Sequence, residues 1–493
     1  MNDQRVRKIV IAGGGTAGWV VAAALSNQLG SLLDITLVES DDIGTVGVGE
    51  ASIPTMRSFH RLAGVDEQEF MKATQSTFKL GISFENWGKV GGKYIHSFGK
   101  VGKSVWMADF HHLWMDAKAR GLAGDLGDYC PELQAALAGK FALSPEGGLN
   151  YAYHLDASLY AKFLRTITEK RGVTRLEGKI VSVNQNPDSG FITSLALDSG
   201  ANVDGDFFID CTGFRGVLIE QTLKTGYEDW SHWLPTDRAL AVQSEMCGPI
   251  PPYTRAVAHD AGWRWQIPLQ KRMGNGLVYC SEYMSDDEAL EQLLLSLDGK
   301  VSTEPFKVKY TTGRRKKAWN KNCVALGLSS GFLEPLESTS IHLIMIGITR
   351  LMQLFPFNGV ADSLIKQFND GTSLELERIR DFIILHYKVT QREDTAFWKF
   401  CKNLDIPQSL SDRLELFKES GIVSQAEGDV FQIDSWLQVM MGQGLHMDNY
   451  HLIGRLMSDQ QLGSALSSLK TSVTQGIAKM PAHHEFLKQY CGN

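Results

Sequence analysis

A glycine-rich turn near the N-terminus has the residue types and spacing that bind the phosphates of a dinucleotide. Its residues, which match the pattern G-x-G-x-x-G, are Gly13, Gly14, Gly15, Thr16, Ala17 and Gly18. The first glycine of the pattern permits a tight turn, the second lets backbone amides approach a pyrophosphate, and the third lets helix and strand pack closely. Glu39 stands about 20 residues later, where an acidic side chain accepts a ribose hydroxyl. The turn and Glu39 are therefore predicted to bind a dinucleotide cofactor.

The elements around the turn support this prediction. Lys8–Ala12 is a short apolar run typical of a buried strand, Trp19–Leu29 is predicted as a helix, and Asp34–Glu39 as the next strand. The turn would then open a βαβ unit, with the pyrophosphate at the positive N-terminus of the helix. The alternative is a glycine-rich turn that holds no ligand.

A second segment bears on which dinucleotide is bound. Phe207–Phe214 reads as a strand that ends in Asp-Cys-Thr-Gly, which resembles the later strand and turn of glutathione-reductase-type flavoproteins. FAD is favoured for this reason, and the predicted fold class is α/β with a glutathione-reductase-type FAD-binding fold. No second G-x-G-x-x-G is present for a nicotinamide cofactor, so we expect diffusible reduced flavin from a separate NAD(P)H-dependent flavin reductase.

Composition limits the class of partner and the compartment. The 493 residues carry a formal net charge of -7, which does not fit a nucleic-acid-binding protein. The longest apolar runs, such as Ile341–Ile348, fall short of the ~20 residues of a membrane span. The seven cysteines form no C-x-x-C pair, so neither a disulfide framework nor a metal site is expected. We expect a cytoplasmic protein that acts on a small molecule, and a homodimer is left open.

The middle of the chain predicts an inserted sheet. Strand-like segments occur at Asp204–Cys211, Ala239–Met246, Trp263–Leu269, Gly276–Tyr283 and Asn322–Leu326, with Arg272–Asn275 as a hairpin turn. Tyr153–Glu169 is predicted as an amphipathic helix, and the small, turn-rich residues from Gly44 to Thr55 as a loop against a ligand.

The chain after Ile341 is almost wholly helical in pattern. We therefore predict an FAD-binding module over residues 1–360, with inserted segments at about 95–150 and 225–320. A mainly α-helical, substrate-side module would follow over residues 361–493.

Five motifs taken together resemble the flavin-dependent tryptophan and indole halogenase family. In order of sequence they are GGGTAGW (13–19), GVGEASIP (47–54), TFK (77–79), WRWQIP (263–268) and EPLEST (334–339). Each motif is weak alone, but their common order and spacing cover residues 7–360, and the similarity continues weakly through Trp436 and residues 442–444.

The resemblance implies a reaction and its catalytic residues. In the family a C4a-hydroperoxyflavin is attacked by chloride or bromide, and the hypohalous acid passes through a tunnel to a lysine beside the substrate. Lys79 matches this lysine, since an amine can deliver the electrophilic halogen to one position of the ring. Glu337 matches the active-site glutamate, which can orient the amine or accept the proton that the ring loses. Without the motif, Lys79 would read as a solvated surface residue.

The residues after Glu337 are predicted to serve both the helix and the halide. Ser338, Thr339 and Ser340 precede an apolar helix and could cap it. In the family the amides at the positions of Thr339 and Ser340 bind halide, while Ser338 can fix the lysine and glutamate through its hydroxyl or carbonyl. Most relatives carry glycine where Ser340 stands, so the preference for bromide or chloride is left open.

The resemblance also implies further cofactor, tunnel and substrate residues. Expected at the flavin are Gly49, Glu50, Ala51 and Gly327; expected along the tunnel or substrate are Trp263, Trp265, Ile267, Pro268, His96, Phe98 and Trp436. Ordinary packing in a core is the alternative for each of the aromatic residues. Tryptophan-specific members have a longer, aromatic-rich segment at about 409–436, so indole or a larger indole-bearing molecule is the better substrate prediction.

Three alternatives compete with this interpretation. A flavin monooxygenase that hydroxylates an aromatic ring shares the cofactor unit but has no evident use for Lys79 with Glu337. Residues 327–331 match the hydrolase pattern G-x-S-x-G, with Asp362 and His386 following, but Pro335 interrupts the helix that the pattern requires. A flavin-binding module without catalysis is the third. His483 and His484 are predicted to be surface residues.

Overall fold

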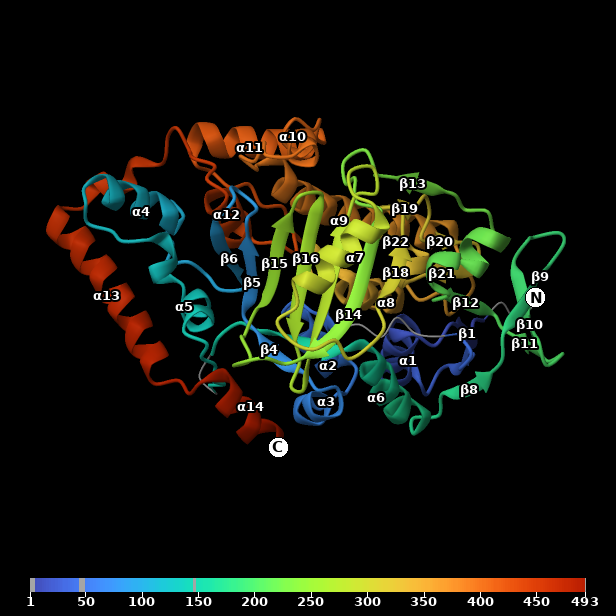
Figure 1. Cartoon of the computed structure of the whole chain (residues 1–493). Coiled ribbons are helices and arrows are strands. Elements are labelled where there is room, and N and C mark those ends of the chain that lie inside the picture. The colour runs from blue at the N-terminus through green and yellow to red at the C-terminus, as the bar shows by residue number, and fades with distance from the viewer. Residues whose placement is uncertain (1–4, 44–48, 145–147, 493) are drawn as a thin grey trace. The chain divides into compact units, whose positions relative to one another are not determined.

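The chain forms two compact units, each built from three separate stretches of sequence. The computed structural model describes residues 5–43, 49–144 and 148–492, and Figure 1 labels their helices and strands. Unit 1 comprises Met1–Ser76, Leu155–Asp237 and Val308–Glu377, and unit 2 comprises Thr77–His154, Arg238–Lys307 and Arg378–Asn493. Both contain helices and strands of several sheets, so the mixed α/β class is confirmed. The division into modules at residue 360 stays a prediction.

The predicted βαβ opening is present in unit 1. Strand β1 (Lys8–Ala12) lies between β2 (Asp34–Glu39) and β12 (Phe207–Asp210) and is parallel to both. The six-stranded sheet has the order β20-β21-β12-β1-β2-β8. Its other strands are β8 (Thr174–Glu177), β20 (Trp319–Asn320) and β21 (Cys323–Ala325). A central strand covered on both faces has no polar face, which is why its residues Ile9 to Ala12 are all apolar and buried.

Helix α1 (Thr16–Leu29) is buried along most of its length, since Gly18 to Ser26 are all buried. It packs on α6 (Ala157–Glu169) and α8 (Ser340–Gln353). The helix starts before the predicted Trp19 because Gly18 belongs to its first turn, where an added Cβ would lie 1.9 Å from the Gly13 carbonyl oxygen. Glycine here serves close packing, as the motif requires, and does not break the helix.

Two three-stranded sheets also belong to unit 1. They consist of β9 (Ile180–Gln185), β10 (Ile192–Leu197) and β11 (Asn202–Asp204), and of β13 (Tyr227–Asp229), β19 (Gly313–Arg315) and β22 (Gly331–Phe332). Two short helices of this unit are α2 (Thr55–Leu62) and α3 (Glu67–Ala73).

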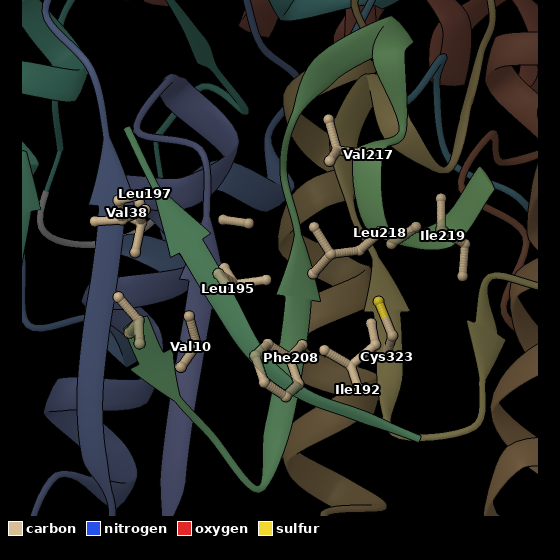
Figure 2. Close-up of a cluster of buried hydrophobic side chains, with 13 residues drawn as sticks. Val10, Val38, Ile192, Leu195, Leu197, Phe208, Val217, Leu218, Ile219 and Cys323 are labelled. Carbon is tan, nitrogen blue, oxygen red and sulfur yellow. The ribbon is translucent and has the colours of Figure 1, made fainter. Parts of the chain in front are cut away.

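One apolar cluster joins the six-stranded sheet to the first of these small sheets. Figure 2 shows Val10 and Phe208 of the large sheet beside Ile192 and Leu195 of β10. Phe208 is fully buried among them. The face of β12 that carries Phe208 is therefore covered by a second sheet.

Unit 2 contains the sheet that the sequence predicts as an insertion. The seven strands have the order β18-β14-β17-β16-β15-β5-β6. Their bounds are β5 (Gly81–Glu85), β6 (Lys93–Ser97), β14 (Arg238–Glu245), β15 (Thr254–His259), β16 (Gly262–Pro268), β17 (Arg272–Tyr279) and β18 (Phe306–Lys309). Figure 1 shows β15 and β16 next to each other in this sheet, with α7 (Asp286–Leu295) nearby. Strand β4 (Thr77–Lys79) pairs separately with β7 (Ala152–Asp156).

Helices form most of the rest of unit 2. They include α4 (Phe110–Ala119), α5 (Pro131–Leu137), α10 (Ala396–Lys402), α11 (Gln408–Ser420), α12 (Ile433–Gly442), α13 (Asp459–Ala478) and α14 (His483–Cys491). The long helix α9 (Asp362–Lys388) runs from unit 1 into unit 2. No helix in the described ranges combines the length and the apolar character that crossing a bilayer requires.

The structure differs from the predicted helix Tyr153–Glu169. Its first residues belong to β7, and α6 begins at Ala157, where the Asp156 carboxylate accepts a hydrogen bond from the Leu159 amide at 3.0 Å. All five residues of β7 are buried, so the strand lacks the alternation that distinguishes a strand from a helix in sequence.

Two predicted strand boundaries are also wrong. Arg272–Asn275 is part of β17 and not a turn, because the Asn275 side chain donates to Ser244 Oγ at 2.9 Å inside the sheet. The segment Asp204–Cys211 holds the end of β11 and the whole of β12, which belong to different sheets. Of the predicted loop Gly44–Thr55, residues 44–48 lie outside the described residues, and β3 (Gly49–Ala51) is a short strand.

The cluster in Figure 2 predicts a large stability loss for Phe208→Ala. Removing a fully buried aromatic ring is expected to lower the free energy of unfolding by about 3–5 kcal/mol. Chemical denaturation measures the change. The control is Val181→Ala in β9, because Val181 is 63% exposed and its replacement should change stability by less than about 0.5 kcal/mol. Equal effects of the two changes would contradict the assignment of this core.

Candidate functional site

The glycine-rich turn of unit 1 brings two distant segments into close contact. An added Cβ on Gly13 would lie 2.4 Å from the Cys211 carbonyl oxygen, and Gly13 has φ +106°, a conformation that favours glycine. Gly15 precedes α1 without any side-chain cap, so the first amides of this helix have no cap from that residue. An uncapped helix N-terminus in a narrow glycine turn can accept an anionic group such as a pyrophosphate.

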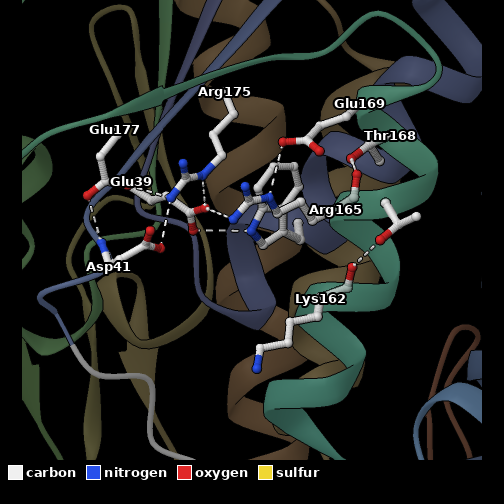
Figure 3. A network of polar contacts seen from close by, with 10 residues as sticks. Glu39, Asp41, Lys162, Arg165, Thr168, Glu169, Arg175 and Glu177 are labelled. Atoms are coloured by element: carbon white, nitrogen blue, oxygen red, sulfur yellow. Dashed lines mark hydrogen bonds and ion pairs between the residues drawn. The ribbon is translucent and has the colours of Figure 1, made fainter.

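Glu39 lies directly over the same turn. Its carboxylate occupies the space of a Gly14 side chain, since an added Cβ would lie 1.6 Å from Glu39 Oε2. Figure 3 shows Arg175 and Arg165 directed at this carboxylate, and the Arg175 Nε to Glu39 Oε1 distance is 2.5 Å. The Trp19 indole donates to Glu39 Oε2 at 3.3 Å. The two arginines and the indole hold the carboxylate in an orientation from which it can also accept a hydroxyl.

Gly327 and Asp210 also belong to the region of this turn, but only Gly327 was predicted as a site residue. Gly327, with φ +71°, approaches Ala17 so closely that an added Cβ would lie 2.8 Å from the Ala17 Cβ, so two predicted cofactor residues are neighbours. Asp210 was not predicted as a site residue. Its buried carboxylate accepts from the amides of Leu218 and Ile219, each at 2.8 Å. The aspartate of the Asp-Cys-Thr-Gly motif thus stabilises the local backbone.

The predicted cofactor residues Gly49, Glu50 and Ala51 form β3, and the carboxyl group of Glu50 has a shifted pKa. Burial raises the pKa of the Glu50 carboxyl to about 7. A carboxyl with this pKa changes its charge near neutral pH.

The segment around Glu337 is a compact turn before a helix. Glu337 is fully buried at the end of a 3-10 turn (Pro335–Glu337), and Ser338 follows with φ +60°, which is strained for a residue other than glycine. Helix α8 starts at Ser340, after Thr339, whose side chain makes no capping bond. The Thr339 Oγ1 atom is buried without a partner among the residues that the structure describes. Of the three residues that could cap this helix, Thr339 is at the capping position, and its side chain does not cap the helix.

One contact near this turn had no signal in the sequence. Glu334 is fully buried, and its Oε2 accepts from Thr236 Oγ1 at 2.7 Å, while the Tyr310 hydroxyl lies 3.1 Å from Thr236 Oγ1. Thr236 and Tyr310 are far from Glu334 in sequence, so only the fold brings them together. They anchor the residue from which the Pro335–Glu337 turn starts.

Lys79 ends strand β4 in unit 2 and is fully buried. Its Nζ lies 5.3 Å from the centre of the Phe98 ring. His96, also buried, packs against Phe98 with ring centres 6.4 Å apart. The predicted residues Lys79, His96 and Phe98 are thus brought together. Lys79 and Glu337 belong to different units, so their pairing stays a prediction.

An aromatic wall extends from His96 to Trp436. The rings of Phe382 and Phe431 stack with centres 3.9 Å apart, and His96 contacts Phe382 at 5.6 Å. Phe382 also contacts Trp436 edge to face at 4.8 Å. Phe382 was not predicted, because a phenylalanine on a long amphipathic helix carries no sequence signal beyond core packing. These flat apolar surfaces can pack against an aromatic ring.

The end of this wall is closed by an arginine. The guanidinium carbon of Arg413 lies 3.9 Å from the centre of the Trp436 ring, and Arg413 also pairs with the buried Asp429 at 3.4 Å. The Trp436 Nε1 atom is buried without a hydrogen-bond partner in the described part of the chain. Trp436 is therefore contacted on its ring face by a cation and in a T-shaped arrangement by the Phe382 ring.

Strand β16 carries Trp263, Trp265, Ile267 and Pro268, all of them buried. The two indoles lie on one face of the strand, as predicted, with centres 6.0 Å apart. Trp265 lies over Gly276 of the neighbouring strand, where an added Cβ would be 1.9 Å from its ring. The place of Trp265 thus depends on a glycine.

The structure does not favour Ser329 as the nucleophile of the hydrolase alternative. Residues Gly327–Ser329 form a 3-10 turn, and the buried Ser329 hydroxyl is engaged by backbone carbonyls, at 2.9 Å in the case of Leu326. The prediction that His483 is a surface residue is wrong. His483 is 1% exposed, and burial lowers its pKa to about 4. Within the described ranges, no three His, Cys, Asp or Glu side chains gather as a metal site would require.

Known proteins match the chain over nearly its full length. The family model for tryptophan halogenases matches residues 8–459. The solved structure of Xcc4156, a flavin-dependent halogenase from Xanthomonas campestris, is 54% identical, has a TM-score of 0.97 and covers 99% of both chains. BrvH, a flavin-dependent halogenase from Brevundimonas sp. BAL3, is 44% identical with a TM-score of 0.95, over 99% of this chain and 100% of BrvH. The tryptophan 6-halogenase SttH of Streptomyces toxytricini is 36% identical over 447 residues, or 85% of each chain.

Glu50 predicts a pH dependence of stability. Its pKa rises from an ordinary 4.5 to about 7 on folding, so its favourable contribution is complete below pH 4.5 and is lost as the pH rises through about 7. At about pH 8 the half-buried, ionised carboxylate is expected to cost at most about 3 kcal/mol. Glu50→Gln should therefore be more stable than the parent at this pH and equal to it at about pH 4, as chemical denaturation without flavin would measure.

The control for this measurement is Glu69→Gln. Glu69 is an exposed carboxylate on α3, and its exchange should leave the difference between the two pH values unchanged. A Glu50→Gln protein with the parent's pH dependence would contradict the assignment.

Proposed function

Since this chain belongs to the tryptophan halogenase family, we propose that it uses reduced FAD, oxygen and a halide to halogenate an electron-rich ring, with Lys79 delivering the halogen. Membership of the family makes the chain an enzyme of the flavin-dependent halogenases, with tryptophan-like aromatic substrates as the class to expect. The lysine, the halide site and the exact substrate are the proposed parts.

The glycine turn and Glu39 are the residues that would hold FAD in a glutathione-reductase-type fold. The fit is supported by the closeness of the Glu39 carboxylate to Gly14 and by the uncapped start of α1 after Gly15. Thr16, Ala17 and Gly18 form the first turn of that helix, and Gly327 lies against it. Bound reduced FAD supplies, with oxygen, the oxidation of halide to hypohalous acid. The reduced flavin would come from a separate NAD(P)H-dependent reductase by diffusion.

The complete burial of Lys79 beside Phe98 is the observation that carries the proposal. Lysine is almost never fully buried for packing alone, because removing its charge from water is costly. An amine in a dry pocket can hold hypohalous acid by a hydrogen bond or as a haloamine, and so confine a reactive oxidant to one place. A surface lysine could also form a haloamine, but it would not confine the oxidant.

Glu337 is proposed as the base for the proton that the halogenated ring loses. A buried carboxylate is suited to accept this proton. Ser338, through its hydroxyl or carbonyl, would help to fix the reacting groups. The amides of Thr339 and Ser340, at the start of α8 where no side chain caps the helix, would bind chloride or bromide.

The aromatic wall is proposed to receive the substrate ring. His96 and Phe98 lie next to Lys79, and Trp436 stands further along the wall, so an indole could stack near the amine. Trp263 and Trp265 on β16, with Ile267 and Pro268, would line the tunnel and keep the ring away from the flavin. Arg413 is covered by Trp436 and paired with Asp429, which disfavours its use as a carboxylate anchor for free tryptophan.

Lys79→Ala is expected to lower ring halogenation by at least about 100-fold, because the group that delivers the oxidant is removed. The assay uses purified protein, an NAD(P)H-dependent flavin reductase, bromide or chloride, and indole. Halogenated product is measured by mass spectrometry, and flavin oxidation should continue at the parent's rate. Lys79→Met is the matched control for volume and should behave alike. Retained halogenation in both variants would remove the lysine from the mechanism.

The same assay separates halogenation from hydroxylation. A product mass that requires halide supports the proposal, whereas a gain of one oxygen without halide would identify the monooxygenase alternative.

Indole is expected to be a better substrate than free tryptophan, by about 10-fold or more in kcat/KM, or about 1.4 kcal/mol. The reason is that Arg413 in the segment 409–436 is covered by Trp436 and paired with Asp429, so it is poorly placed to bind the carboxylate. Steady-state rates with indole, tryptophan and tryptamine measure the difference. Tryptamine keeps the side chain but lacks the carboxylate, so a preference for tryptophan over both would contradict this specificity.

A further inference from the structure

A buried histidine connects the strand of Lys79 to two strands of the seven-stranded sheet. His154 on β7 lies directly opposite Thr77 on β4, with its Nδ1 atom 2.8 Å from Thr77 Oγ1. Its Nε2 atom lies 2.9 Å from Oγ1 of Thr254, the first residue of β15. Thr77 Oγ1 in turn donates to the carbonyl of Pro268, the last residue of β16, at 2.7 Å. All of these side chains are buried.

The direction of each hydrogen bond follows from the chemistry of the groups. A carbonyl only accepts, so the single hydroxyl proton of Thr77 is committed to Pro268. Thr77 Oγ1 must then accept from His154, which places a proton on Nδ1. The Nε2 atom carries the lone pair of a neutral imidazole and accepts from the Thr254 hydroxyl. The four groups thus form a one-way chain of donors from Thr254 to Pro268.

The electrical surroundings favour the same neutral form. Burial lowers the pKa of His154 well below its usual range, and the Lys79 cation and His483 lower it further. Thr77 and Lys79 are two residues apart on β4 and point to the same face, so His154 is a diagonal cross-strand neighbour of Lys79. A protonated imidazole there would place a second positive charge beside the lysine.

We propose that His154 is a positioning residue for Lys79. The neutral imidazole holds strand β4 against the end of strand β16, which carries Trp263 and Trp265, and adds no charge beside the amine. The inference rests on the proposed role of Lys79. The chain Thr254, His154, Thr77 and Pro268 fixes the height and the face at which β4 presents its lysine. Because a displacement of about 1 Å can cost about 100-fold in rate, loss of these bonds should let oxidant escape before it reacts.

The test measures coupling, which is the amount of halogenated indole formed divided by the total amount of hypohalous acid formed. That total is the sum of the hypohalous acid that halogenates indole and the hypohalous acid that escapes. Escaped hypohalous acid is trapped by an added halogen acceptor such as monochlorodimedone. His154→Leu and Thr77→Val should lower coupling by at least about 10-fold while oxidant is still made at the parent's rate. A purely structural role would lower oxidant formation and product together.

Two amide variants sharpen the test. The Asn side-chain nitrogen reaches the place of Nδ1 and can donate to Thr77, so His154→Asn should keep most of the coupling. The amide of His154→Gln reaches toward the place of Nε2, and this variant should resemble His154→Leu. Equal coupling in the Asn and Gln variants would overturn the proposal, and so would parent-like coupling in the Leu and Val variants.

The matched control is His259→Asn. His259 is likewise buried and bonded through Nε2, to the Val278 carbonyl at 3.0 Å, but it ends β15 where Thr254 begins it. Its exchange should shift the unfolding midpoint and leave coupling unchanged. The proposed function itself fails if Lys79→Ala still halogenates indole. If Lys79→Ala loses halogenation but His154→Leu keeps the coupling of the parent protein, only the role of His154 is rejected.

Discussion

The cost of removing one ammonium group from water shapes the part of unit 2 around Lys79. A lysine with no exposed surface loses hydration that only well-placed neighbours replace, and the ring of Phe98 at 5.3 Å supplies part of this. His154, which lies opposite Thr77 on the neighbouring strand, is held neutral by burial and by the charge of the lysine itself. An aromatic ring thus lies beside the amine, and a neutral imidazole lies diagonally across from the lysine on the neighbouring strand.

Unit 1 meets a different constraint, which is the approach of backbone to backbone. The turn at Gly13 touches the carbonyl of Cys211, and Gly14 lies under the carboxylate of Glu39. Side chains are excluded at both positions by distances that no rotamer could relieve. Helices α1 and α8 of the same unit begin without a side-chain cap, and both N-termini are places where backbone amides can face an anion.

Local spacing made part of this site predictable from sequence. The glycine turn, Glu39 and the strands on either side of α1 follow from patterns about 30 residues long, and the same holds for Trp263 and Trp265 on one strand face. Phe382, Arg413 and the chain from Thr254 to Pro268 did not follow, because these contacts join segments that only the fold brings together. Strand β7 was misread for a related reason: a strand buried on both faces shows no alternation. His483 looked exposed because a polar pair near a C-terminus gives no sign of what covers it.

Ser338 has a consequence for how this turn tolerates change. Its backbone stands at φ +60°, where exchange to glycine would remove the strain at once and at little steric cost. Folding alone would therefore admit glycine at this position. What the exchange would take away is the Ser338 hydroxyl, while the carbonyl of residue 338 would stay in place.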